Sequence, residues 1–108
     1  MKSSIHIRLG EIPEVVSLSL QIPEFVDPHL APLYEQRLNP VQHLIIVAEV
    51  DKKPVGFKVG YQREDYFYSW MGAVLPPFRR LGIAQKLANY QEKWAKSEGY
   101  TTIRCKTR

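Results

Sequence analysis

Along the first third of the chain, the spacing of hydrophobic and polar residues predicts a strand, a helix, a loop and a second helix. Residues 5–10 (IHIRLG) alternate apolar and polar side chains, which is typical of a short strand. Residues 11–20 space their apolar side chains as a helix does, with Pro13 in the first turn, where a missing N–H is tolerated. Three prolines then indicate a loop that leads into a second short helix over about residues 31–38. This loop is a candidate lid over a site, or a plain connection.

The middle of the chain predicts three strands in succession. They cover residues 43–50 (HLIIVAEV), 55–62 (VGFKVGYQ) and 66–75 (YFYSWMGAVL). The segments between them, DKKP and RED, are short and polar, so the strands are expected to pair as an antiparallel meander. Gly72 interrupts the third strand, at a position that predicts a bulge or the close approach of another group.

The last third of the chain predicts a crossover between parallel strands. Pro76 and Pro77 end the third strand, because neither can donate to a ladder. Residues 82–97 have helical periodicity, Gly99 is a candidate C-cap, and residues 100–107 (YTTIRCKT) form a final strand. The fold class is therefore α/β with a mixed sheet, ordered strand, two helices, three strands, helix and strand, in a single domain over residues 1–108.

Composition limits the class of protein further. A chain of 108 residues is long enough for one core, and 44% hydrophobic residues is typical of a globular domain. No apolar run approaches the roughly 18 residues of a membrane span, and the N-terminus lacks a signal-like apolar segment. The single cysteine, Cys105, has no internal disulfide partner, which fits a reducing compartment. We therefore expect a cytoplasmic protein without a membrane partner.

Charge is distributed unevenly along the chain. The formal net charge is +4, but the segment from Arg79 to Arg108 has eight basic and two acidic residues and therefore carries +6. A positive field of this kind suits an anionic ligand such as a phosphorylated cofactor, a nucleic acid or an acidic surface. The alternative is a solvated basic face.

The pattern Arg79-x-x-Gly82-x-Ala84 stands where the predicted third strand gives way to the helix. The first turn of a helix leaves N–H groups without partners, and the helix dipole adds partial positive charge there. Small residues let a phosphate approach these amides, and arginines add charge-assisted hydrogen bonds. The pattern lacks the lysine of a P-loop and the spacing of a dinucleotide fingerprint.

This pattern, in this order of elements, resembles the acyl-CoA-binding motif Gln/Arg-x-x-Gly-x-Gly/Ala of the GNAT superfamily of N-acetyltransferases. The resemblance implies an enzyme with acetyl-CoA as cosubstrate, whose acyl group passes directly to the amine of a small molecule, a protein N-terminus or a lysine. It also implies that strand backbone around a bulge at Gly72 binds the pantetheine arm and that the loop amides bind the diphosphate. The implied cofactor-binding residues are Gly72, Ala73, Val74, Arg79, Arg80, Leu81, Gly82, Ile83 and Ala84.

The sequence departs from the family after the fifth strand. The family's next helix, which often carries a tyrosine as general acid, and its last two strands are not contained in these 108 residues. We therefore expect a C-terminally truncated member with unknown catalytic residues. We also expect a dimer or higher oligomer, since the last strand would be an open edge.

Outside this pattern, the sequence gives weaker signals for catalytic or metal-binding residues. The third strand of the meander offers no carboxylate as general base over residues 66–71, and its aromatic face of Tyr66, Tyr68 and Trp70 is either core or an acceptor pocket. Cys105 is expected to be a small core residue rather than a nucleophile. The three histidines lack metal-ligand spacing, so no metal is expected.

Two further classes of function stay open at this stage. The chain could be a non-catalytic CoA-binding or protein-interaction module. A nucleic-acid-binding domain is supported by the +6 segment alone, with no recognition motif beside it, and nucleic acid is not expected as a partner.

Overall fold

The computed structural model of the protein describes residues 4–105 and contains the elements in the order predicted from the sequence. Their bounds are β1 Ile5–Leu9, α1 Ile12–Ser19, α2 Ala31–Leu38, β2 His43–Val50, β3 Lys53–Arg63, β4 Tyr66–Val74, the 3-10 helix η1 Pro76–Phe78, α3 Ile83–Ser97 and β5 Ile103–Cys105. The expected α/β class with a mixed sheet is confirmed.

The sheet has the strand order β1-β2-β3-β4-β5. Neighbours from β1 to β4 pair antiparallel, and β5 pairs parallel to β4, with Phe67 opposite Ile103 and Ser69 opposite Cys105. The meander and the crossover through α3 are therefore both as predicted. None of the helices between residues 4 and 105 has the length and apolar character that crossing a membrane requires.

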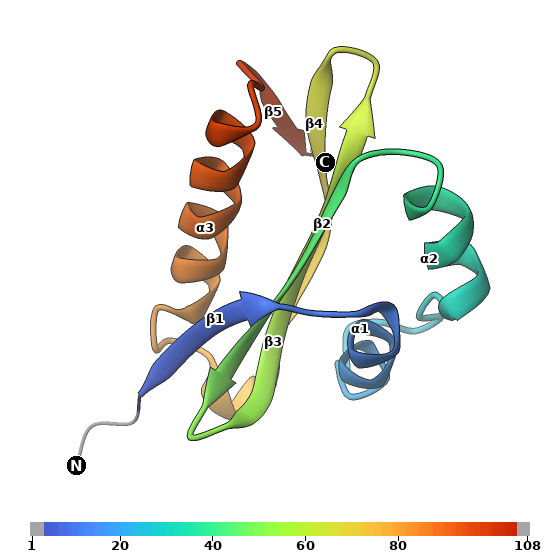
Figure 1. Cartoon of the computed structure of the whole chain (residues 1–108). Coiled ribbons are helices and arrows are strands. Elements are labelled where there is room, and N and C mark those ends of the chain that lie inside the picture. Colours follow the sequence, from blue (N-terminus) through green and yellow to red (C-terminus); the bar gives the residue numbers. More distant parts are fainter. Residues whose placement is uncertain (1–3, 106–108) are drawn as a thin grey trace.

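Helices cover both faces of the sheet, with α3 on one side and α1 and α2 on the other (Figure 1). β2 is buried on both faces because its side chains alternate between the two layers, Ile45 and Val47 toward α1 and α2, Ile46 and Ala48 toward α3. This double burial explains why its sequence is a continuous apolar run.

The bulge predicted at Gly72 lies two residues earlier. Val59 of β3 pairs with Met71 and Gly60 pairs with Ser69, so Trp70 is the extra residue of β4. Trp70 and Met71 consequently both pack against the α1 and α2 layer. Gly72 itself is paired in register with Lys58, and the prediction of its position was therefore wrong.

α3 ends in the glycine cap expected from the sequence, but the strand after it begins later than predicted. Gly99 has a φ of 96°, and the Tyr100 N–H donates to the Ala95 carbonyl at 3.0 Å, as in a Schellman motif. Tyr100 then packs on Phe67 and Trp94 instead of joining the sheet. The predicted strand over residues 100–107 is thus β5 from Ile103, and residues 106 and 107 lie outside the described part.

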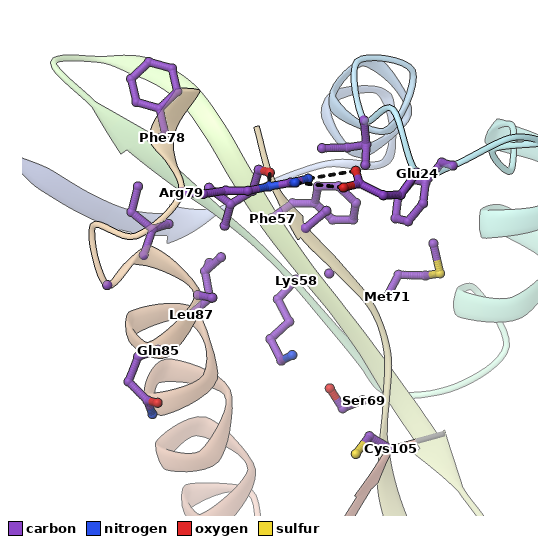
Figure 2. A pocket seen from close by; sticks show the side chains of 18 of the residues that line it. Glu24, Phe57, Lys58, Ser69, Met71, Phe78, Arg79, Gln85, Leu87 and Cys105 are labelled. Atoms are coloured by element: carbon purple, nitrogen blue, oxygen red, sulfur yellow. Dashed lines mark hydrogen bonds and ion pairs between the residues drawn. The ribbon is translucent and has the colours of Figure 1, made fainter. Parts of the chain in front are cut away.

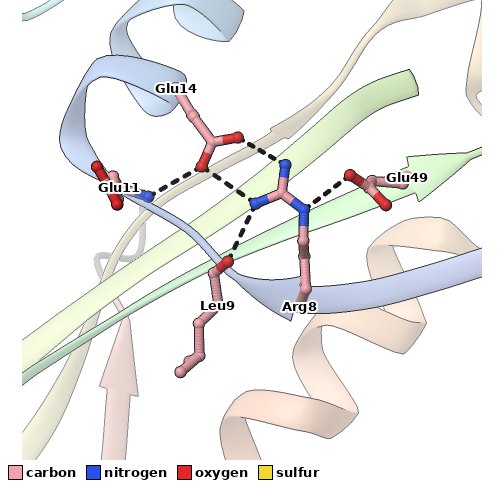
Figure 3. A network of polar contacts seen from close by, with 5 residues as sticks. All are labelled: Arg8, Leu9, Glu11, Glu14 and Glu49. Atoms are coloured by element: carbon pink, nitrogen blue, oxygen red, sulfur yellow. Dashed lines mark hydrogen bonds and ion pairs between the residues drawn. The ribbon is translucent and has the colours of Figure 1, made fainter. Parts of the chain in front are cut away.

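Arg8 links three elements at the other end of the sheet (Figure 3). Its guanidinium donates to Glu49 of β2 at 2.7 Å and to Glu14 of α1 at 2.6 and 3.1 Å. Glu14 also accepts the backbone N–H of Glu11 at the start of α1, and these bonds, above all the one from Arg8, lower the pKa of its carboxyl. Arg8 therefore fixes α1 against the edge of the sheet formed by β1 and β2.

Candidate functional site

A cavity of about 690 Å³ opens between the second half of β4, the start of α3 and the connection between α1 and α2. Figure 2 shows its lining side chains from both layers. Of the nine residues implied as cofactor-binding, eight line this cavity: Gly72, Ala73, Val74, Arg79, Arg80, Gly82, Ile83 and Ala84. The ninth, Leu81, is not among the lining residues and is 52% exposed. The fold thus brings two sequence segments to one cavity.

The loop before α3 turns sharply through two left-handed residues. Gly82 is the N-cap with a φ of 81°, and Arg80 has a φ of 67°, which is uncommon for a residue with a side chain. The N–H of Lys86 donates to the Gly82 carbonyl at 3.1 Å, so the N–H groups of Ile83, Ala84 and Gln85 precede the first intrahelical bond. A Cβ on Gly82 would have no atom within 4 Å, so this end of the helix is open.

Arg79 is committed to contacts within the protein. Its guanidinium forms a paired contact with the Glu24 carboxylate at 2.8 and 2.9 Å, and its Nε donates to the Val74 carbonyl at 2.9 Å. Arg79 lowers the pKa of Glu24 to about 2, and the pKa of Arg79 is raised in return. The side chain thus spans the cavity from the loop before α3 to the connection after α1 (Figure 2). Arg80, by contrast, is exposed at the rim.

Among the described residues, β5 covers only part of the edge of β4 next to the cavity. The pairing with β5 covers Phe67 to Ser69, and beyond it the described residues provide no strand partner for Gly72 and Ala73 on this side. Gly72, Ala73 and Val74 all line the cavity, and Gly72 can contribute only backbone atoms to it. Strand backbone of this kind can hydrogen-bond an extended ligand.

Lys58 is a residue of the cavity that the sequence analysis did not single out. It lies on β3 opposite Gly72, and its neighbours Phe57 and Val59 face the other layer, so its side chain faces α3. Burial lowers the pKa of the Lys58 amine, an effect that the nearby Cys105 partly offsets. The signal was present in the strand VGFKVGYQ, where Gly56, Lys58 and Gly60 form the face opposite the apolar one.

The aromatic residues of β4 and Cys105 occupy different environments in the structure. Tyr68 and Trp70 are partly buried against the core on the α1 and α2 side, and Trp70 also lines the cavity, whereas Tyr66 lies under the Arg104 guanidinium at 4.7 Å. Cys105 lines the cavity and is exposed, so the expectation of a core residue was wrong. Within residues 4–105, no group of three or more His, Cys, Asp or Glu is placed to hold a metal ion.

The sequence matches the model of the acetyltransferase (GNAT) family over residues 13–108. Among solved structures, the chain is similar to the ribosomal-protein-S18-alanine N-acetyltransferase from Escherichia coli, with a TM-score of 0.82, 17% identity, and coverage of 97% of this chain and 68% of that one. It is also similar to the aminoglycoside N-acetyltransferase AAC(6')-Iy in complex with CoA, with a TM-score of 0.77, 23% identity, and coverage of 100% and 80%.

A third similar structure is the PaiA N-acetyltransferase from Thermoplasma acidophilum in complex with coenzyme A. Its TM-score is 0.73 at 15% identity, with 94% of this chain and 78% of that chain covered. No curated protein matches the sequence. At these identities the structural likenesses show a shared fold.

Proposed function

The chain belongs to the GNAT family of acetyltransferases, because the family's model matches residues 13–108, and we propose that it transfers an acetyl group from acetyl-CoA to a primary amine by direct attack. The observation that carries the proposal is the cavity of about 690 Å³, which joins the second half of β4, left uncovered at Gly72 and Ala73 by the described part of β5, to the open start of α3. A single ligand with an extended arm and a diphosphate would use both features.

In this proposal, the CoA diphosphate lies against the first N–H groups of α3. These amides and the helix dipole favour an anion there, and the absence of a side chain at Gly82 leaves room for it. Arg80 supplies the nearby cation from the rim, since the Arg79 guanidinium is held by Glu24. The pantetheine arm runs along Val74, Ala73 and Gly72, where backbone groups of β4 hydrogen-bond its amides.

The protein's contribution to the chemistry is then mainly positioning. The acyl group reaches the part of β4 near the Trp70 bulge, and the acceptor amine approaches from the side lined by Phe25, Trp70 and Met71. Among the residues that line the cavity, Glu24 is the only carboxylate, and its pairing with Arg79 keeps its pKa at about 2, which makes it a poor base. We therefore propose that the acceptor enters as the free amine.

Two measurements test the proposal. Acetyl-CoA and CoA are expected to raise the unfolding midpoint, because a ligand that binds the native state stabilises it by mass action. An oligonucleotide is expected to leave the midpoint unchanged. A panel of amines with thiol release as the readout then identifies the acceptor. A midpoint raised by CoA without turnover of any amine would indicate a CoA-binding module, and an unchanged midpoint would refute the proposed cofactor.

A further inference from the structure

Lys58 is the only lysine among the described residues that is not exposed. Lys52, Lys53, Lys86, Lys93 and Lys96 are exposed, whereas Lys58 is partly buried in the cavity. No carboxylate of residues 4–105 forms an ion pair with it, and Glu24, the one carboxylate of the cavity lining, is held by Arg79. The amine is thus partly buried without a carboxylate as counter-charge, which favours its neutral, nucleophilic form.

The Lys58 side chain lies over Gly72, its partner in the pairing of β3 with β4. A Cβ built on Gly72 would lie 3.4 Å from Cγ of Lys58 and 3.6 Å from its Nζ, so both ends of the lysine side chain border the position of a side chain at residue 72. Figure 2 shows the amine directed toward Ser69 and Cys105, on the side of the sheet that faces α3. Lys58 therefore runs beside the same stretch of β4 that would receive the pantetheine arm.

We propose that Lys58 is an internal acyl acceptor, whose Nζ takes the acetyl group from acetyl-CoA bound in the cavity. The inference rests on the proposed function, since it needs acyl-CoA to lie along β4 with its thioester toward the Trp70 bulge. Both the thioester and the amine would then lie near Ser69, which pairs with Cys105 and lines the cavity together with it.

The reaction is a simple aminolysis. The neutral amine of Lys58 attacks the thioester carbonyl, the N–C bond forms and the C–S bond breaks. The amine loses one proton, which the departing thiolate takes up, so the products are Nε-acetyl-Lys58 and CoA thiol. No oxidant, metal or further reactant is needed. Burial supports the step, because it lowers the pKa of the Lys58 amine and so increases the unprotonated fraction.

The test is incubation of the whole chain with acetyl-CoA, followed by intact mass and peptide mapping. We expect one acetyl group, located on Lys58, and a rate per molecule that is independent of protein concentration, because the transfer is intramolecular. Excess CoA is expected to suppress it by occupying the cavity. Lys58→Arg retains a long basic side chain but removes the amine that is acylated, so it should lose the modification, whereas the matched variant Lys86→Arg, at an exposed lysine of α3, should retain it.

Acetyl phosphate provides the chemical control, since it acetylates exposed lysines without a CoA site. Acetylation by acetyl-CoA that is spread over the exposed lysines, or absent from Lys58 in a protein that binds CoA, would overturn the inference. The wild-type peptide map gives this answer even if Lys58→Arg fails to fold. The outcomes also separate the two proposals: thiol release with an external amine and an unmodified Lys58 would refute the internal acceptor alone. No midpoint shift with CoA and no thiol release would refute both.

Discussion

Gly82 acts at the scale of a single residue, through its backbone conformation. Its φ of 81° is the left-handed region, where a side chain costs about 1–2 kcal/mol. Gly82→Glu is expected to lose about that much stability and to abolish acetyl-CoA binding, because the carboxylate would occupy the anion position at the start of α3. Calorimetric titration with acetyl-CoA measures the second effect.

Gly99 offers a matched control for this substitution. It caps the other end of α3 with a φ of 96°, and like Gly82 it has no atom within 4 Å of a built Cβ. Gly99→Glu should therefore bring a comparable backbone strain and the same charge, yet leave binding intact. Equal affinities of the two variants for acetyl-CoA would mean that the loop before α3 does not hold the diphosphate.

The Glu24–Arg79 pair should show its own pH dependence. Because the pKa of Glu24 is lowered to about 2 in the fold, its contribution to stability is present above its ordinary value of 4.5 and is lost as the pH falls from there toward 2. The unfolding midpoint of Glu24→Gln should thus lie below that of the wild type at neutral pH and converge with it on acidification. The difference should be small, since both side chains are exposed.

Glu35→Gln serves as the reference for Glu24→Gln. Glu35 is an exposed carboxylate of α2 that takes part in none of the ion pairs between described residues. Its replacement should leave the unfolding midpoint at neutral pH close to that of the wild type, because no ion pair between described residues is lost. If Glu24→Gln and Glu35→Gln have the same unfolding midpoint at each pH, the pairing of Glu24 with Arg79 does not contribute to the stability of the cavity rim.

At the scale of the element, α3 carries a buried polar residue on its inner face. Gln91 is 2% exposed, and its Nε2 has no hydrogen-bond partner within the described part of the chain. Gln91→Leu should raise the free energy of unfolding by about 1 kcal/mol, because it removes an unpaired donor from the core. Chemical denaturation measures this, with Gln85→Leu on the exposed face of α3 as a control expected within about 0.5 kcal/mol of the wild type. A destabilised Gln91→Leu would show that the amide has a partner in solution.

Helices and strands were predictable from the sequence where the spacing of apolar residues is a clear local signal. The bounds of α2 and β2 follow directly from the sequence, because their apolar spacing and flanking prolines are local signals. The bulge was misplaced because Gly72 is a conspicuous residue, whereas the true position, Trp70, is set by two neighbouring side chains packing into one layer. That packing cannot be predicted from the neighbouring residues in the sequence.

At the scale of the whole molecule, contacts between distant segments limited the prediction of the site. The motif Arg79-x-x-Gly82-x-Ala84 located the cavity, but the role of Arg79 depends on Glu24, which is 55 residues away in the chain. Lys58 likewise enters the cavity only because β3 and β4 pair in the register that sets it opposite Gly72. Such contacts follow from the assembled fold and not from any single segment.

The charge of the whole molecule gives the last prediction. The net charge is +4, and the basic excess lies in the segment that begins at Arg79 and contains α3. A diphosphate at the start of α3 would lie in this positive field, and salt screens such a field over a length that falls from about 10 Å at 0.1 M to about 3 Å at 1 M. The dissociation constant of acetyl-CoA should therefore rise several-fold between low and high salt. S-acetylpantetheine, which lacks the phosphates but retains the arm and the thioester, should bind with little dependence on salt. Calorimetric titration of both ligands at two salt concentrations makes the comparison, and a flat response for acetyl-CoA would contradict an electrostatic diphosphate site while leaving the contacts of the arm with β4 untouched.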